Sequence, residues 1–134
     1  MKDNYFLDSS VILYAIGDET EKKMKSVSLL QGQPFLSTQV ISEISNVMNR
    51  KLKMTYSDIA SITNKIVQNS NLVLIDYHTI QSAYRLAERY SFSYYDSLII
   101  ASAIENFCSV LYTEDLNNNQ KIEGNLRIIN PFIF

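Results

Sequence analysis

Tyr5-Phe6-Leu7-Asp8-Ser9-Ser10-Val11-Ile12-Leu13-Tyr14, spanning residues 5–14, joins a short apolar run to a strong helix-start signal. The three residues before Asp8 are typical of a short buried strand, and Asp8-Ser9-Ser10 supplies side chains that cap a helix. In an open parallel sheet, the ends of strands and the starts of helices meet at one edge, where ligands bind. We therefore expect Asp8 to be held rigidly at the carboxyl edge of an α/β sheet.

The alternation of apolar runs with helical patterns continues along the chain. Strands are predicted at 35–36, 72–75, 110–112 and 126–129, and helices at 19–30, from 38, from 55, at 78–90 and at 93–107. The uninterrupted apolar run at 72–75 predicts a strand buried on both faces, and Val40, Ile44 and Val47 form the buried stripe of one helix. This alternation favours right-handed crossovers and a parallel sheet between helices. With 134 residues and no internal repeat or linker, the chain is predicted to be one domain, 1–134.

Composition and charge narrow the class of protein. The net charge of −2 argues against a basic protein that coats nucleic acid, but it leaves room for a nuclease with local basic clusters. Arg50, Lys51 and Lys53 are candidate RNA contacts, and the alternative is that they form a solvated helix face. The single cysteine, Cys108, cannot form an internal disulfide, which suits a reducing compartment. Because no segment has the length of a signal or membrane span, we expect a soluble cytoplasmic protein without membrane contact.

Four carboxylates stand at the starts or edges of predicted elements: Asp8, Glu43, Asp96 and Asp115. Each has an ordinary alternative. Asp8 is a helix cap, Glu43 lies at the margin of a buried stripe, Asp96 completes a capping box with Ser93, and Asp115 belongs to a turn. Taken singly, these residues support only an α/β domain with an acidic edge.

Carboxylates gathered at one edge repel each other unless a cation joins them, and hard divalent ions take oxygen ligands. The chain has no P-loop, serine triad or set of His and Cys ligands that competes with the four acids. The single histidine, His78, is interpreted as a surface or capping residue. The pattern therefore indicates an enzyme of metal-dependent phosphate chemistry, in which a metal-bound water of lowered pKa removes the need for a catalytic histidine.

Four stretches resemble the motifs of PIN-domain nucleases. The opening Asp8-Ser9-Ser10-Val11-Ile12-Leu13-Tyr14-Ala15 is similar to the family's Asp-Thr/Ser-Asn, three hydrophobic residues, Tyr-Ala. The stretch 36–43 is similar to the second acidic motif, 87–103 gives the longest match, and 111–116 continues it. The size and the lack of extra domains look most like the ribonuclease toxins of VapBC-type toxin–antitoxin pairs.

This resemblance implies a three-layer fold with a five-stranded parallel sheet between helices, and a Mg²⁺- or Mn²⁺-dependent endoribonuclease. It implies that the four acids are catalytic and bind the metal. It also implies that Ser10 and Thr113 orient these acids without binding the metal themselves. Ser10 departs from the family's usual Asn, whereas Thr113 matches the usual Ser or Thr. The implied partners are an RNA substrate, a small cognate antitoxin and a second copy of the chain in a homodimer.

Two other functions stay open on the sequence. One is a catalytically silent PIN-like module that binds RNA or protein, which the departure at Ser10 allows. The other is an aspartyl-phosphate phosphotransfer protein, a class that also places an aspartate after a strand. The second function is the weaker, because a phosphatase of that type has an aspartate where Ser10 stands.

Overall fold

The computed structural model describes residues 3–134, and its strands are short. Each predicted strand is present, and they are β1 (Tyr5–Leu7), β2 (Phe35–Ser37), β3 (Asn71–Val73), β4 (Val110–Tyr112) and β6 (Leu126–Ile129), with the additional β5 (Lys121–Ile122). The helices are α1 (Ser9–Ile12), the 3₁₀ turn η1 (Leu13–Ala15), α2 (Thr20–Gln31), α3 (Thr38–Arg50), α4 (Tyr56–Gln68), α5 (Tyr77–Tyr90) and α6 (Tyr94–Glu105).

Side-chain caps explain where several helices begin. Ser37 caps α3, Thr55 caps α4 and Ser93 caps α6, and each side chain accepts a hydrogen bond from the backbone N–H three residues on. Asp76 does the same for α5. Ser37 ends β2 and the other three caps follow irregular segments, so the caps fix the points at which the chain enters each helix.

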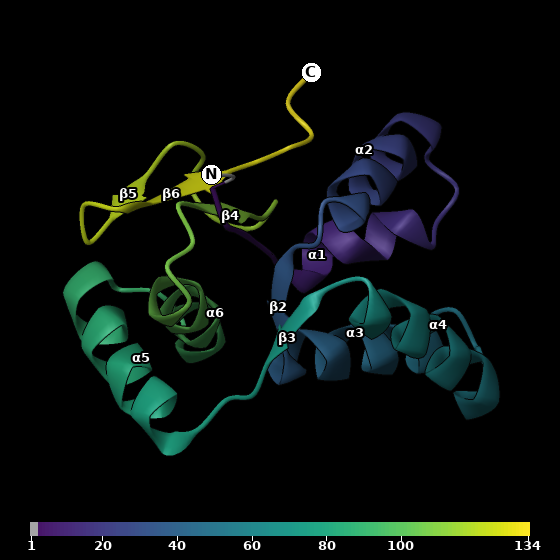
Figure 1. The fold of residues 1–134 in the computed structure, drawn as a ribbon, viewed down its shortest axis with the longest axis horizontal. Helices are drawn as coiled ribbons and strands as arrows, with labels where there is room; N and C mark the ends of the chain where they lie inside the picture. Colours follow the sequence, from purple (N-terminus) through teal and green to yellow (C-terminus); the bar gives the residue numbers. More distant parts are fainter. Residues whose placement is uncertain (1–2) are drawn as a thin grey trace.

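The six strands form one sheet in the order β3-β2-β1-β4-β6-β5. All neighbours are parallel except β5 and β6, which form an antiparallel pair. In Figure 1, α5 and α6 lie on one side of the strands, and α1 to α4 lie on the other. The α/β three-layer prediction with five parallel strands is therefore confirmed, and β5 adds a short antiparallel edge that the sequence analysis missed.

The core lies between the sheet and the helices on both sides. Central strand residues are fully buried, among them Phe6, Leu36, Leu111 and Ile128. Helix α6, predicted to be apolar on most sides, is buried continuously from residue 97 to 103. On α3 the buried stripe is Val40, Ile44 and Met48, so the prediction of Val47 in this stripe was displaced by one residue.

The prediction that residues 72–75 form a strand buried on both faces was wrong. The strand is β3, which covers 71–73 and lies at the edge of the sheet, paired only with β2. Leu72 is exposed, and the Leu74 side chain beyond the strand is 77% exposed. An apolar run reports β-propensity, but the position of a strand within a sheet depends on strand order, which the run does not encode.

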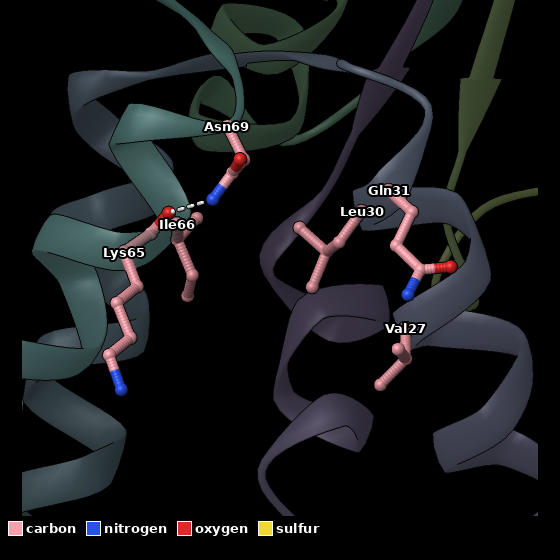
Figure 2. Close-up of a pocket in the computed structure, with 6 residues that line it drawn as sticks. All are labelled: Val27, Leu30, Gln31, Lys65, Ile66 and Asn69. Atoms are coloured by element: carbon pink, nitrogen blue, oxygen red, sulfur yellow. Dashed lines mark hydrogen bonds between the residues drawn. The ribbon is translucent and has the colours of Figure 1, made fainter.

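An apolar groove opens between α2 and α4, near the amino edge of the sheet. Figure 2 shows Val27, Leu30 and Gln31 of α2 facing Lys65 and Ile66 of α4 and the following residue Asn69. Both helix ends lead into β2 and β3, so the groove opens away from the carboxyl ends of the strands. Within residues 3–134, no helix has the length and apolar character needed to cross a membrane.

The contrast between two leucines tests this arrangement. We expect Leu111→Ala, in the buried central strand β4, to lower the free energy of unfolding by about 2–5 kcal/mol, because it leaves a cavity. Leu74→Ala removes an exposed side chain and should change it by less than about 0.5 kcal/mol. Denaturant titrations measure both values, and equal losses would contradict the exposed position of Leu74.

Candidate functional site

The strand order places a crevice beside β1. From β1 the chain moves to β2 and β3 on one side and then returns to β4 on the other side, which makes the carboxyl ends of β1 and β4 a topological switch point. Open α/β sheets bind ligands at such a point. Asp8 directly follows β1, and Thr113, Glu114 and Asp115 follow β4.

Asp8 is the most firmly held of the four acids. It is only 7% exposed, and its Oδ1 accepts a hydrogen bond from Ser9 N at 2.8 Å, which caps α1. Its Oδ2 accepts hydrogen bonds from Thr113 Oγ1 at 2.8 Å and from Ser10 Oγ at 3.0 Å. Asp8 therefore has two roles: its Oδ1 caps α1, as predicted, and its Oδ2 is fixed by side chains at the switch point.

Glu43 reaches the same region from the second turn of α3. One oxygen, Oε2, accepts a hydrogen bond from Gln39 Nε2 at 3.3 Å, whereas Oε1 is buried without a hydrogen-bond partner among the described residues. Burial raises the pKa of Glu43, and the nearby charges of Asp8 and Asp96 raise it further. Buried carboxylate oxygens without a partner are rare in proteins, and such an oxygen is well suited to binding an ion.

Asp96 and Asp115 complete the group from two further elements. Asp96 lies in the first turn of α6, where its backbone N–H donates to the Ser93 side chain at 3.2 Å, which is the Ser93 half of the predicted capping box. The backbone N–H of Asp115 donates to Thr113 Oγ1 at 3.2 Å. Partial burial raises the pKa of Asp115, as do the charges of Asp8 and Asp96. The four acids therefore act on one another electrostatically.

Gln39 is a residue of this site that the sequence analysis missed. Its Nε2 donates both to Glu43 Oε2 and, at 3.1 Å, to the backbone carbonyl of Tyr95, one residue before Asp96. It thereby links α3 to the start of α6. The signal for its first contact was available, since residues four apart share one helix face, but the second contact depends on the tertiary fold.

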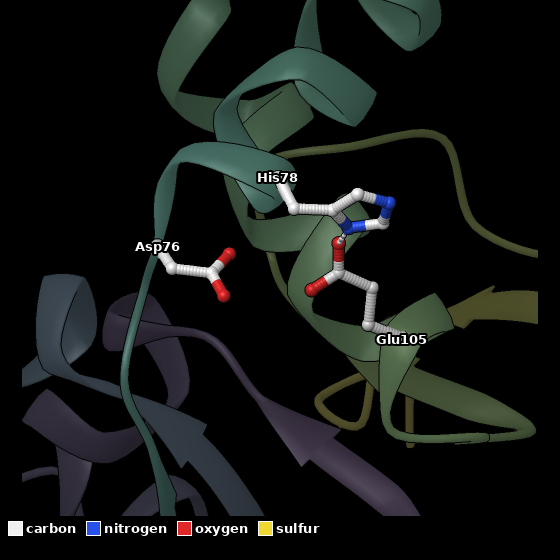
Figure 3. Close-up of side chains that lie close together, drawn as sticks. All are labelled: Asp76, His78 and Glu105. Atoms are coloured by element: carbon white, nitrogen blue, oxygen red, sulfur yellow. Dashed lines mark hydrogen bonds and ion pairs between the residues drawn. The ribbon is translucent and has the colours of Figure 1, made fainter.

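A second group of metal-ligand type lies elsewhere. Among residues 3–134, one set of three such side chains has ligand atoms within 4.8 Å of one another: Asp76, His78 and Glu105 (Figure 3). Within the same residues, no three of the four acids have ligand atoms this close to one another. Glu105 lies nine residues after Asp96 on α6, which is about 13 Å along the helix.

Ordinary contacts account for this second group. Asp76 caps α5 by accepting from Thr79 N at 3.0 Å, and Glu105 accepts from Thr79 Oγ1 at 2.7 Å. His78 is exposed in the first turn of α5, with Nδ1 3.1 Å from Glu105 Oε1. The interpretation of His78 as a surface residue agrees with this position, although the cap itself is Asp76.

The predicted RNA contacts lie apart from the acids. Arg50 ends α3, and Lys51 and Lys53 follow it in an exposed turn. Arg50 lies seven positions after Glu43, which is about 10 Å along the helix, in the direction away from the carboxyl edge of the sheet. The structure does not bring these cations together with the four acids.

Residues 5–121 match the sequence profile of the PIN domain. The chain belongs to the PIN domain family. This PIN domain has no significant match among curated protein sequences.

Solved structures share the fold of this PIN domain. It is similar to a chain of a toxin–antitoxin complex from Klebsiella pneumoniae, with a TM-score of 0.72 and 14% identity over 96% of this chain and 98% of that one. It is also similar to VapC20 of Mycobacterium tuberculosis, a sarcin-ricin-loop-cleaving toxin (TM-score 0.67, 16% identity, 84% and 92% covered). A chain of DNA-bound VapBC from Salmonella typhimurium gives a TM-score of 0.68 at 18% identity, with 95% and 97% covered. At these identities the likeness concerns the fold.

The raised pKa values of Glu43 and Asp115 predict how the metal-free protein responds to pH. A raised pKa in the folded state favours folding when the carboxyl is protonated, so this contribution is complete below the ordinary values of 4.5 for Glu and 3.8 for Asp. It is lost as the pH rises through the raised values. At pH 7 in chelator, we expect Glu43→Gln to raise the melting temperature by roughly 2–4 °C, a figure that allows for solvent screening.

The control for this experiment is Glu88→Gln, which removes an exposed charge on α5. Its melting temperature should stay close to that of the parent at every pH. The benefit of Glu43→Gln should also disappear near pH 4. If Glu43→Gln raised the melting temperature by the same amount at pH 4 and pH 7, charge repulsion would not be the cause of the increase.

Proposed function

We propose that this PIN domain is a Mg²⁺- or Mn²⁺-dependent endoribonuclease and the toxin of a toxin–antitoxin pair. The observation that supports the proposal is a set of four carboxylates beside the β1/β4 switch point, close enough for their charges to raise the pKa of Glu43 and Asp115. One oxygen of this set, Oε1 of Glu43, is buried without a hydrogen-bond partner among the described residues. Family membership supports a nuclease, and the sarcin-ricin-loop-cleaving VapC20 among similar structures supports RNA as the substrate.

The donor set fits a hard divalent ion. Asp8, Glu43, Asp96 and Asp115 offer only oxygen atoms, which Mg²⁺ and Mn²⁺ prefer. All four side chains would hold the ion; Asp8 is buried, Glu43 and Asp96 are half-buried, and Asp115 is the most exposed of the four. When bound, such an ion supplies a water of lowered pKa and a positive charge for phosphoryl oxygens.

The protein's own contribution is to fix the carboxylates. The hydroxyls of Thr113 and Ser10 donate to Asp8 Oδ2, while Oδ1 accepts from the backbone of α1, so both oxygens are held in place. Gln39 binds Oε2 of Glu43 and leaves the buried Oε1 without a partner among the described residues. Carboxylates fixed in this way would hold a cation and orient an attacking water with little rearrangement.

Ser10 can serve in place of the family's usual Asn. Its hydroxyl donates to Asp8 and accepts from the backbone N–H of Glu114 at 3.2 Å, so it joins the end of β1 to the turn after β4. An Asn side chain at this position would offer the same pair of roles, a donor and an acceptor. The contacts of Ser10 therefore support an active enzyme over a silent module.

An antitoxin partner is part of the same proposal. Several similar folds come from toxin–antitoxin complexes, including those from Klebsiella pneumoniae and Salmonella typhimurium. An acidic group of this kind is a suitable target for an arginine or lysine of a small inhibitor, which would supply positive charge. We further propose that the active form is a homodimer.

Asp96→Asn is the most direct test of the enzyme. The change preserves shape and removes one charge, so we expect RNA cleavage in Mg²⁺ or Mn²⁺ to fall by at least about a hundredfold. Chelator should abolish cleavage by the parent. The measurement is the initial rate on a single-stranded RNA with purified protein.

Asp58→Asn is the matched control, because Asp58 is an exposed first-turn aspartate of α4. It should cleave at the parent's rate. Cleavage by Asp96→Asn at the rate of Asp58→Asn, or cleavage that persists in excess chelator, would overturn the proposed mechanism.

The toxin role has a separate test. Expression of the chain alone should arrest growth, and co-expression with the adjacent small reading frame should restore growth and yield a stable complex on a sizing column. A chain that cleaves RNA, leaves growth unchanged and binds no adjacent product would be a nuclease of another role.

A further inference from the structure

A fifth carboxylate, Glu114, lies between Thr113 and Asp115 and is bound on both of its oxygens. Tyr14 donates its hydroxyl to Glu114 Oε1 at 2.6 Å, and Lys22 Nζ donates to Oε2 at 3.0 Å. Lys22 Nζ also donates to the Tyr14 hydroxyl at 3.1 Å, which closes a ring of three polar groups. We call Tyr14, Lys22 and Glu114 the clamp.

The clamp rests on an aromatic base. The Tyr14 ring packs edge-on against Phe132 with centroids 4.7 Å apart, and Lys22 Nζ lies 4.5 Å from the Tyr14 ring centroid. Lys22 and Glu114 are each 29% exposed in their side chains, so water screens their ion pair only in part. Four segments meet here: η1, α2, the turn after β4 and the C-terminal segment.

The clamp is joined to the acid group through the backbone. The N–H of Glu114 donates to Ser10 Oγ, and Ser10 Oγ donates to Asp8 Oδ2. Glu114 is also the residue next to Asp115 and one of the charges that act on it. Without the clamp, the turn after β4 would present two adjacent carboxylates to the site instead of one.

We propose that Lys22 and Tyr14 hold the Glu114 carboxylate away from the metal-binding group and cancel its charge, so that the turn after β4 presents Asp115 alone. Lys22 is then a positioning residue, which acts on the metal site through Glu114. This inference rests on the proposed function for the existence of the metal site. A different role for Lys22, direct contact with RNA phosphate, fits less well, because its ammonium group is already bound to Glu114 and Tyr14 and has Glu19 at 3.9 Å.

Mn²⁺ affinity measures this role without any cleavage assay. In Lys22→Met the Glu114 carboxylate is free to approach the ion, so we expect Mn²⁺ to bind about three to ten times more tightly than to the parent. Lys22→Arg keeps the charge and should stay within about twofold of the parent. Lys23→Met, at an exposed position on the same helix, is the matched control and should bind as the parent does.

A double-mutant cycle distinguishes restraint of the Glu114 carboxylate by Lys22 from a general effect of the Lys22 charge on Mn²⁺ binding. In the parent background, Glu114→Gln should weaken Mn²⁺ binding by less than about threefold, because the clamp keeps this charge away. In the Lys22→Met background the same change should weaken binding by about tenfold. Equal factors in the two backgrounds would overturn the proposal, as would weaker Mn²⁺ binding by Lys22→Met.

Two further variants keep the test decisive. Tyr14→Phe removes only the hydroxyl that binds Glu114 and leaves the ring on Phe132, so it should tighten Mn²⁺ binding by about twofold even if Lys22→Met folds poorly. Unchanged binding by Tyr14→Phe would count against the clamp. Asp96→Asn reports on the metal site itself. If this variant binds Mn²⁺ as the parent does, the proposed function fails. If it binds Mn²⁺ more weakly but Glu114→Gln has equal effects with and without Lys22→Met, only the proposal about the clamp fails.

Discussion

The hydrogen bond from Thr113 to Asp8 joins the two strands on which the rest of the site depends. It spans 2.8 Å in space and 105 residues in sequence, and it crosses the crevice between β1 and β4. A carboxylate that is only 7% exposed is costly unless its oxygens are bonded, and Asp8 satisfies this requirement with hydroxyls and a backbone N–H. The pairing of β1 with β4, with Leu7 opposite Tyr112, brings these partners into reach.

Electrostatic repulsion shapes the surroundings of that bond. Glu43 and Asp115 have raised pKa values because each is partly buried and near other acids, so the group is more stable with a cation than without one. Glu114 would add to this repulsion, but Lys22 and Tyr14 bind it. The acids thus fall into two sets, four whose charges act on one another and one that is paired with Lys22.

Much of the fold could be predicted from the sequence because the signals for it lie in neighbouring residues. Caps at Ser37, Thr55 and Ser93 and the apolar helix α6 were readable from neighbouring residues. The edge position of β3 and the antiparallel β5 were not, since strand order arises from contacts between distant segments.

The same division holds for the site. The four acids could be proposed from strand ends and a family resemblance, but the clamp could not, because Glu114 and its two partners are 92 and 100 residues apart. Nothing in the residues around Glu114 indicates an ion pair with Lys22. Gln39 is an intermediate case, because its partner Glu43 is on the same helix and its other partner, the carbonyl of Tyr95, is on α6.

The long separation between Asp8 and Thr113 has a consequence during translation. A nascent chain exposes Asp8 and Glu43 early, yet β1 lacks its neighbour β4 until the ribosome has passed residue 112. Pairing of such distant strands is slow to form and comes late in folding. The four acids therefore come together only after Asp115 has been made, and a shorter nascent chain does not carry their mutual repulsion.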